Sequence, residues 1–399
     1  MKILMIGPSK SDSHNFGFGL ATENIAVQLG AMSELTIVSP VQASAIASEE
    51  TNGQIEVAIK ESLLDAKSVD ATAVEIHIET ILTPYFYHPS HEKPTTEVTV
   101  SSVEIKKALK AYSQSVIKHV ESLDYDVIYA HDWLSIGAAI HLKEKYNKPL
   151  VLHIHALDYD RTGKKSDSWV YKLEKEGLEK ADMIIAVSEY HARIMQRHYT
   201  IDKKKIKVVH LASQKTKPVE YISPFEEDVI LFAGRLSHQK GIFTFIDIAS
   251  ELIKNYDNLK FVVAGNGELS QEVVSKVNEK GLANYFSFTG LLERAALHAL
   301  MKESKVLVVP SISEPFGLVA LEAALNELPV IITSNSGVIE ILKGSFIPEK
   351  ENVAGYVKLI KEVLTDNDSI AKGVAKNKEA ALKRTWQHVG EEVYKLLAS

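Results

Sequence analysis

Short apolar runs rich in β-branched residues alternate along most of the chain with amphipathic stretches whose apolar residues recur every three or four positions. Such runs begin at Lys2–Ile6 and recur at Val127–Ala130, Leu150–Ile154, Val229–Phe232 and Val306–Val309. Short continuous apolar runs separated by helical periodicity are typical of parallel strands buried on both faces. The pattern therefore predicts an α/β chain built from successive βαβ units.

The βαβ pattern occurs as two series. Around Ser213–Glu227 the composition turns polar and proline-bearing, which is typical of a linker. We therefore predict one Rossmann-like domain over residues 1–213, a linker over 214–227 and a second Rossmann-like series from residue 228. A chain of 399 residues is long enough for two such domains.

The most informative unit of the second series is Val306–Thr333, in which two strands flank a helix that Pro329 terminates. Its loop lies where ligands of open α/β sheets bind, at the carboxyl end of a parallel strand. Glu314 lies in the loop and Glu322 in the helix, which opens at Gly317. A helix N-terminus suits phosphate, and an acid at each end suits hydroxyls on both sides of a diphosphate, as in a nucleotide-sugar.

The pattern E-P-F-G-L-x(4)-E closely resembles the glutamate pair of retaining glycosyltransferases of family 4 and of the glycogen and starch synthases. The resemblance implies that Glu314 holds the donor hexose and Glu322 the nucleotide ribose. The donor is also expected to contact the residues that follow Glu314 in the sequence, Pro315, Phe316, Gly317 and Leu318. The alternative is a plain loop acid followed by an exposed helical glutamate.

Two cations follow the first strand of the second series. Arg235 and Lys240 lie in G-R-L and K-G phrases that resemble the diphosphate clamp of the same family. The alternative is two solvated cations. Further substrate-binding candidates at neighbouring strand ends are Gly234, Gly265, Leu291 and Leu292, and the family suggests the two leucines for the base pocket.

Polar residues also end two strands of the first series. His131-Asp132-Trp133 resembles the same triplet of glycogen synthases, and the next strand ends in His155. An imidazole or carboxylate at such an edge can face a ligand. We take Asp132 and His155 as catalytic candidates together with Arg235, Lys240 and Glu314, and the resemblance implies that His155 contacts the donor sugar near its anomeric carbon.

The glycine-rich stretch Gly7–Gly19 invites a dinucleotide-binding interpretation. The third fingerprint glycine is missing, and the second strand ends in Ser39-Pro40 without an acid for a ribose, so NAD binding is disfavoured. Gly17 and Gly19 instead resemble the loop that faces the donor phosphates in the family. A Phe16-Gly17-Phe18-Gly19 sequence here replaces the commoner double glycine.

Asp158-Tyr159-Asp160 spells a D-x-D triplet, which can hold a divalent metal in other proteins. It precedes Arg161 and Gly163, and we interpret it as a loop with local charge pairs. We therefore expect no metal and no cofactor, because two cations and a helix dipole already supply positive charge for a diphosphate.

Composition narrows the function classes. A formal net charge of −7 gives no support to nucleic-acid binding, and the absence of cysteine excludes disulfides and thiolate chemistry. No apolar run reaches the ~18 residues that a membrane span needs, and the N-terminal run is too short for a signal peptide. We expect a cytoplasmic protein, and the oligomeric state stays open.

The resemblance implies a GT-B fold, in which two Rossmann-like domains face each other across a cleft. The C-terminal domain (228–375) would hold the donor, the N-terminal domain the acceptor, and the terminal helix (376–399) would cross back to the N-terminal domain. The expected reaction is transfer of a hexose, glucose first, from a UDP- or ADP-sugar with retained anomeric configuration to a glycan, possibly an α-glucan as in glycogen synthesis.

Three alternatives stay open. Within glycosyl transfer, the acceptor could be a small molecule or a cell-surface glycan. A catalytically silent relative would only bind a nucleotide-sugar or glycan. An epimerase or a pyridoxal phosphate-dependent phosphorylase shares the two-Rossmann architecture, although no lysine is identified for that cofactor.

Overall fold

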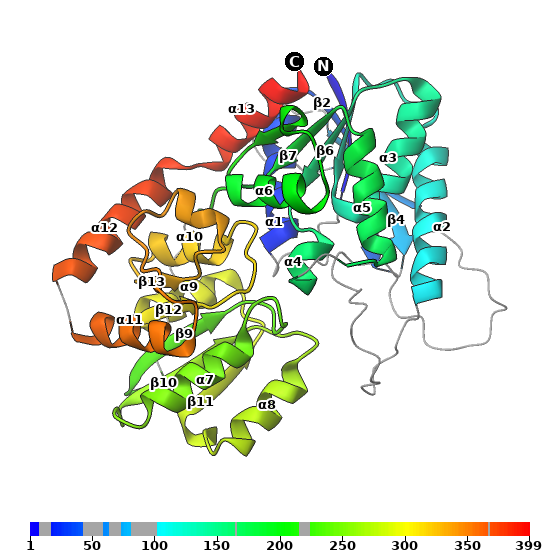
Figure 1. The fold of residues 1–399 in the computed structure, drawn as a ribbon. Helices are drawn as coiled ribbons and strands as arrows, with labels where there is room; N and C mark the ends of the chain where they lie inside the picture. Colours follow the sequence, from blue (N-terminus) through cyan, green and yellow to red (C-terminus); the bar gives the residue numbers. More distant parts are fainter. Residues whose placement is uncertain are drawn as a thin grey trace.

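The computed structural model describes residues 1–7, 17–42, 59–63, 73–80, 102–163, 166–214, 224–365 and 368–399. They form two α/β domains, with the chain termini side by side at the far end of the first (Figure 1). This arrangement confirms the predicted pair of Rossmann-like domains.

The first domain is built on an eight-stranded sheet. Its strands are β1 (Lys2–Ile6), β2 (Glu34–Gln42), β3 (Ile59–Leu63), β4 (Ala73–Thr80), β5 (Val127–His131), β6 (Leu150–Ile154), β7 (Met183–Ala186) and β8 (Ile206–Val208). Their order is β3-β4-β2-β1-β5-β6-β7-β8, and only β3 runs antiparallel to its neighbour. Every residue of β5 and β6 is buried, as continuous apolar runs predict.

Six α-helices belong to the described part of this domain. They are α1 (Gly17–Gly30), α2 (Ser102–Val120), α3 (Asp132–Tyr146), α4 (Asp158–Thr162), α5 (Trp169–Lys180) and α6 (Glu189–His198). The Ser168 and Ser188 side chains cap α5 and α6 by accepting hydrogen bonds from the amides of Tyr171 and His191. A short turn, η1 (Lys203–Lys205), precedes β8.

The second domain has five parallel strands in the order β11-β10-β9-β12-β13. They are β9 (Asp228–Ala233), β10 (Leu259–Ala264), β11 (Phe286–Gly290), β12 (Val306–Val309) and β13 (Val330–Ile332). The helices that follow are α7 (Ile242–Leu252), α8 (Ser270–Glu279), α9 (Arg294–Glu303), α10 (Leu318–Leu325), α11 (Val353–Thr365), α12 (Asp368–Lys383) and α13 (Trp386–Leu397), with short turns η2 (Ala283–Tyr285) and η3 (Gly337–Glu340).

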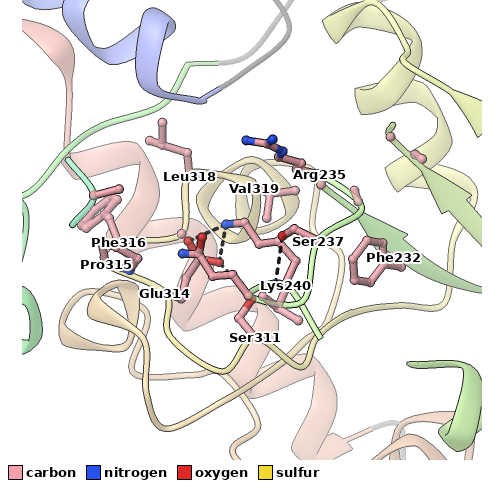
Figure 2. A pocket seen from close by; sticks show the side chains of 18 of the residues that line it. Phe232, Arg235, Ser237, Lys240, Ser311, Glu314, Pro315, Phe316, Leu318 and Val319 are labelled. Carbon is pink, nitrogen blue, oxygen red and sulfur yellow. Dashed lines mark hydrogen bonds and ion pairs between the residues drawn. The ribbon is translucent and has the colours of Figure 1, made fainter. Parts of the chain in front are cut away.

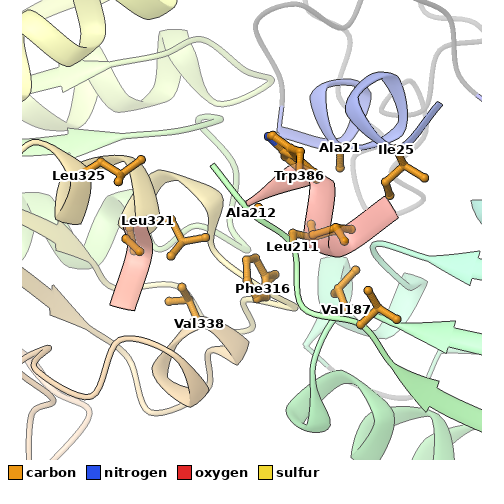
Figure 3. Close-up of a cluster of buried hydrophobic side chains, with 14 of the residues drawn as sticks. Ala21, Ile25, Val187, Leu211, Ala212, Phe316, Leu321, Leu325, Val338 and Trp386 are labelled. Atoms are coloured by element: carbon orange, nitrogen blue, oxygen red, sulfur yellow. The ribbon is translucent and has the colours of Figure 1, made fainter. Parts of the chain in front are cut away.

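One hydrophobic cluster joins the two domains. Leu211 and Ala212 lie on the connecting segment after β8, and Phe316 from the second domain packs beside them (Figure 3). Trp386 and Ile25 extend the cluster across α13 and α1. Burial of apolar surface from both domains in one cluster favours a fixed relative placement.

The C-terminal region corrects a prediction. The sequence pattern predicts one helix over Ser369–Ser399, of which 376–399 was expected to cross back to the first domain, but the structure has two helices that meet at Arg384-Thr385. The Thr385 side chain caps α13 by accepting from the His388 amide, while the Arg384 guanidinium binds the His210 carbonyl oxygen. α12 therefore packs on α10 of the second domain, and α13 packs on α1 of the first.

Other local predictions were also wrong. Gly17 and Gly19 lie in the first turn of α1 rather than in a loop. The sequence also predicts a loop or short helix over Ser62–Ser68, but Ser62-Leu63 belongs to β3. Pairing of β3 with β4 explains the second error, because a ladder overrides weak local preference. The sequence also predicts a strand over Ile55–Ile59, of which only Ile59 is among the described residues. Residues 215–223 of the predicted linker lie outside the described residues.

Candidate functional site

Each sheet reverses its strand order at one point, between β1 and β5 in the first domain and between β9 and β12 in the second. Ligands of open α/β sheets bind at such points, beyond the carboxyl ends of the strands. A pocket of about 270 Å³ lies there, lined by both domains. The sequence-predicted residues that line it are Asp132, His155, Gly234, Arg235, Lys240, Gly265, Leu291, Leu292, Glu314, Pro315, Phe316, Gly317, Leu318 and Glu322.

Glycines shape one wall of the pocket. Gly234 and Gly265 have φ angles of 152° and 146°, and a Cβ at Gly265 would clash with the Gly234 carbonyl oxygen. Gly241, with φ 71°, precedes α7, and a Cβ there would clash with the Pro310 carbonyl oxygen. These contacts let the ends of β9, β10 and β12 approach one another closely.

Glu314 is held at the centre of the pocket. The Lys240 ammonium lies 2.9 and 2.7 Å from its two carboxylate oxygens (Figure 2). The Ser311 hydroxyl donates to Oε2 at 3.0 Å, and Glu314 itself is 5% exposed. Lys240 is therefore not a solvated cation, because its ammonium pairs with the buried Glu314 carboxylate.

Glu322 is also buried rather than exposed on the helix surface. It lies inside α10, is 7% exposed and pairs with the Arg294 guanidinium at the start of α9. Burial raises the pKa of Glu322, and the Arg294 charge opposes that rise. Arg294 was not predicted, because no spacing in the sequence links it to Glu322.

Arg235 has an acidic partner as well. Its Nε donates to Glu268 Oε2 at 2.9 Å, and both residues line the pocket. Glu268 follows Gly265-Asn266-Gly267 at the end of β10. The sequence predicted Gly265 as a substrate-binding residue but not Glu268. Three cations of the second domain thus reach the pocket, each beside a carboxylate.

Asp132 and His155 reach the pocket from the first domain. Asp132 begins α3 with φ 51°, and its Oδ1 accepts a hydrogen bond from the His155 amide at 2.7 Å. Burial raises the pKa of Asp132 to about 8, although backbone donors oppose the rise. Burial lowers the pKa of His155 well below its usual value, so its imidazole is neutral.

His155 belongs to a stack of three buried imidazoles that sequence reasoning did not assemble. His131 Nδ1 lies 3.1 Å from His155 Nε2, and His153 Nδ1 lies 2.6 Å from the Tyr129 hydroxyl. A ring nitrogen of each histidine lies within 4.8 Å of the others, which would suit a metal. The ring planes are within 29° of parallel, and two of these nitrogens, His131 Nδ1 and His155 Nε2, already bond to each other.

The D-x-D triplet lies in the short helix α4 rather than in a loop. Asp158 accepts from the Ser166 and Ser168 hydroxyls, with Ser168 at 3.0 Å. Asp160 accepts from the Leu157 amide at 2.8 Å and from Ser313 Oγ at 2.6 Å. The Arg161 guanidinium pairs with buried Glu174 at 2.8 Å. Both aspartates are thus committed to protein donors.

Gly17 and Gly19 do not line the pocket, although Leu20 of the same helix does. Residues 8–16 of the predicted glycine-rich loop lie outside the described residues. Within the described part of the chain, no helix is both long enough and apolar enough to cross a membrane.

Two family profiles match the chain next to each other. The profile described as "Glycosyltransferase Family 4" matches residues 80–212, and the one described as "Glycosyl transferases group 1" matches residues 213–382. Together they cover most of both domains.

Three curated relatives match over both domains or a large part of them. An uncharacterized glycosyltransferase of Methanocaldococcus jannaschii is 27% identical over 68% of this chain and 75% of its own. A glycogen synthase of Mycobacterium tuberculosis is 28% identical over 60% of each chain. A D-inositol 3-phosphate glycosyltransferase of Corynebacterium urealyticum is 23% identical over 75% of this chain and 78% of its own.

Solved structures share the fold over nearly the whole chain. Sucrose-phosphate synthase from Thermosynechococcus elongatus superposes with a TM-score of 0.75 at 16% identity, over 99% of this chain and 98% of its own. Anabaena HepE, solved with UDP and glucose, superposes with a TM-score of 0.69 at 16% identity over the full length of both chains.

Proposed function

Because this chain belongs to the GT-B glycosyltransferases of the family 4 type, we propose that it transfers a hexose from a nucleoside diphosphate sugar with retention of anomeric configuration. The observation that carries the proposal is the pocket around the start of α10. Glu314 lies before that helix, Glu322 lies inside it, and both are buried in the same cavity.

The donor would lie along the N-terminus of α10. The diphosphate would meet the free amides that follow Gly317, and the Arg235 and Lys240 side chains would supply charge as the nucleotide departs. Lys240 would then exchange part of its contact with Glu314 for phosphate oxygens. Glu314 would turn to the hexose hydroxyls, and Glu322 would hold the ribose.

The acceptor side would be formed by the first domain. His155 and Asp132 line the pocket from the first domain, and a neutral His155 imidazole can donate a hydrogen bond to the sugar or accept one from it. We assign no residue as a double-displacement nucleophile. A same-face displacement with an oxocarbenium-like sugar is the mechanism that this arrangement supports best.

Two classes of acceptor are candidates. The glycogen synthase relative and the His131-Asp132-Trp133 triplet favour an α-glucan. The D-inositol 3-phosphate glycosyltransferase relative, which matches a larger share of both chains, favours a small phosphorylated acceptor. UDP and glucose in the HepE complex support UDP-glucose as the first donor to test.

A donor screen tests the proposal. UDP- and ADP-sugars are incubated with glucan oligomers or with small polyol phosphates, and free nucleotide and product are measured. We expect turnover with one nucleotide and an α-linked product from an α-linked donor. A protein that binds the donors but forms no product would be a silent relative, and a product of inverted configuration would refute retention.

A further inference from the structure

The loop that carries Glu314, Ser311–Pro315, is held from both domains at once. On its own domain, the Ile312 amide donates to the Gln239 carbonyl oxygen at 2.8 Å, and Gln239 Nε2 donates to the Ser313 carbonyl oxygen at 3.1 Å. From the first domain, the Ser188 hydroxyl donates to the Pro315 carbonyl oxygen at 2.6 Å. The residues on either side of Glu314 therefore touch the opposite domain.

The Ser313 hydroxyl makes a further contact with the first domain, which is the strongest of the interdomain bonds of this loop. This hydroxyl donates to Asp160 Oδ1 at 2.6 Å and lies 3.0 Å from the Tyr190 hydroxyl. A serine hydroxyl has one proton, so with that proton on Asp160 the Tyr190 hydroxyl is the donor in the second bond. Charge-assisted O–H···O bonds of this length are stronger than neutral ones.

Asp160 can hold this position because its other oxygen is also engaged. Oδ2 accepts from the Leu157 amide at 2.8 Å and lies 3.2 Å from His191 Nε2. Asp160 and His191 are 0% exposed, and Ser313 is 2% exposed. The network is thus shielded from water and ends on the residue directly before Glu314.

We propose that Asp160 is a positioning residue that acts through Ser313 to fix the Glu314 carboxylate when the two domains meet. The proposal rests on the role of Glu314 given above. It assigns the D-x-D triplet a function other than metal binding, in which the first domain sets the geometry of the acid on the second.

Hydrogen exchange and nucleotide binding test the proposal without requiring turnover. In Asp160→Asn and Ser313→Ala, the amides of peptides covering 311–317 should exchange about tenfold faster than in the wild type. UDP affinity, measured by isothermal titration, should stay within about twofold. If the wild type turns over a donor, kcat should fall about tenfold or more with the donor KM little changed, because a displaced acid weakens the transition state more than ground-state binding.

The matched control is Glu340→Gln, which changes another interdomain carboxylate to its amide. Glu340 accepts from the Glu189 and Tyr190 amides at the start of α6 and lies 2.7 Å from His210 Nε2. Among the described residues its carboxylate therefore bonds to the backbone of Tyr190 but not to Asp160 or Ser313. Exchange in peptides 311–317 should stay near the wild-type rate in this variant. Equal acceleration in Glu340→Gln and Asp160→Asn, or no acceleration in Asp160→Asn and Ser313→Ala, would overturn the proposal.

An inactive wild type would refute the proposed transfer reaction alone, because the exchange measurement would still report on the loop. Tyr190→Phe guards against misfolding, since it removes only one hydroxyl from the network. It should accelerate exchange in the same peptides by a smaller factor than Ser313→Ala, and an unchanged rate would count against the network.

Discussion

At the scale of single residues, the site pairs each proposed ligand group with a partner in the protein. Glu314 has Lys240, Glu322 has Arg294 and Arg235 has Glu268. A buried charge without a partner costs several kcal/mol, so these pairs keep the pocket charged in the absence of donor. A donor that displaces part of each pair would meet groups that are already in place.

We expect Lys240→Ala and Arg235→Ala to lower turnover by about 10² to 10³, the usual effect of removing one transition-state charge partner. Lys240→Ala should have the larger effect, because it also leaves buried Glu314 without its cation. Initial rates at saturating donor check this, with Lys254→Ala in the exposed turn after α7 as the control. Near-wild-type kcat in both variants would rule out the diphosphate clamp.

Replacing each of the two glutamates should impair recognition of a different part of the donor. A hydrogen bond to a charged group is worth ~1.5–3 kcal/mol, so Glu322→Gln should weaken binding of the free nucleoside diphosphate about tenfold or more. Glu314→Gln should keep that affinity while slowing transfer and reducing discrimination between two epimeric donors. Isothermal titration and initial rates measure both effects. Equal loss of nucleotide affinity in the two variants would reverse the assignment of the glutamates.

At the scale of elements, the ends of β5 and β6 bring three imidazoles into one buried stack. Burial lowers the pKa of His153 to about 3, and it lowers the pKa values of His131 and His155 well below the usual value. These histidines are neutral in the native protein but become protonated in the unfolded chain below about pH 6.5. The unfolded state then binds more protons, so stability should fall as the pH drops from about 6.5.

Replacing one histidine of the stack tests whether stability falls in this way as the pH drops. His153→Gln should reduce the loss of unfolding free energy between pH 6 and pH 5 by about 1.4 kcal/mol, the value of one proton per pH unit. Urea unfolding at the two pH values measures the difference. His141 lies on the exposed surface of α3, outside the stack, and His141→Gln is measured beside it as the matched substitution. An identical slope in His153→Gln would mean that His153 is not neutral in the native state.

At the scale of the whole molecule, the chain ends on the domain where it began. α13 packs on α1 beside the shared hydrophobic cluster, and α12 stays with the second domain (Figure 1). The helices approach so closely that a Cβ at Gly390 would clash with the Gln28 side chain. This close packing joins the C-terminal segment to the first sheet.

Gly390→Ala should therefore destabilise the protein by about 1–3 kcal/mol, the usual cost of overpacking, despite the better helix propensity of alanine. Nucleotide affinity should change little, because the proposed donor site lies on the second domain. Thermal unfolding and titration with UDP measure the two effects, with exposed Lys395→Ala on the same helix as the control. A rise in stability would show that α13 and α1 can move apart without a loss of unfolding free energy.

The sequence by itself determined the elements and the residues that their strand ends present. Apolar runs buried on both faces marked most of the strands, and Glu314, Lys240, Asp132 and His155 were expected at strand edges before any contact was known. Local chemistry suffices for this, because the carboxyl ends of parallel strands in each sheet lie along one edge.

Only the tertiary structure decided the partners. Arg294 beside Glu322, Glu268 beside Arg235 and Asp160 beside Ser313 join residues that are 28, 33 and 153 positions apart. The same holds for the break at Arg384, where α12 and α13 pack on different domains. The first two pairs form between elements of the second domain, and the third forms between the two domains. Such contacts depend on how distant elements and domains pack, and no periodicity or spacing along the chain encodes the distance between two packed surfaces.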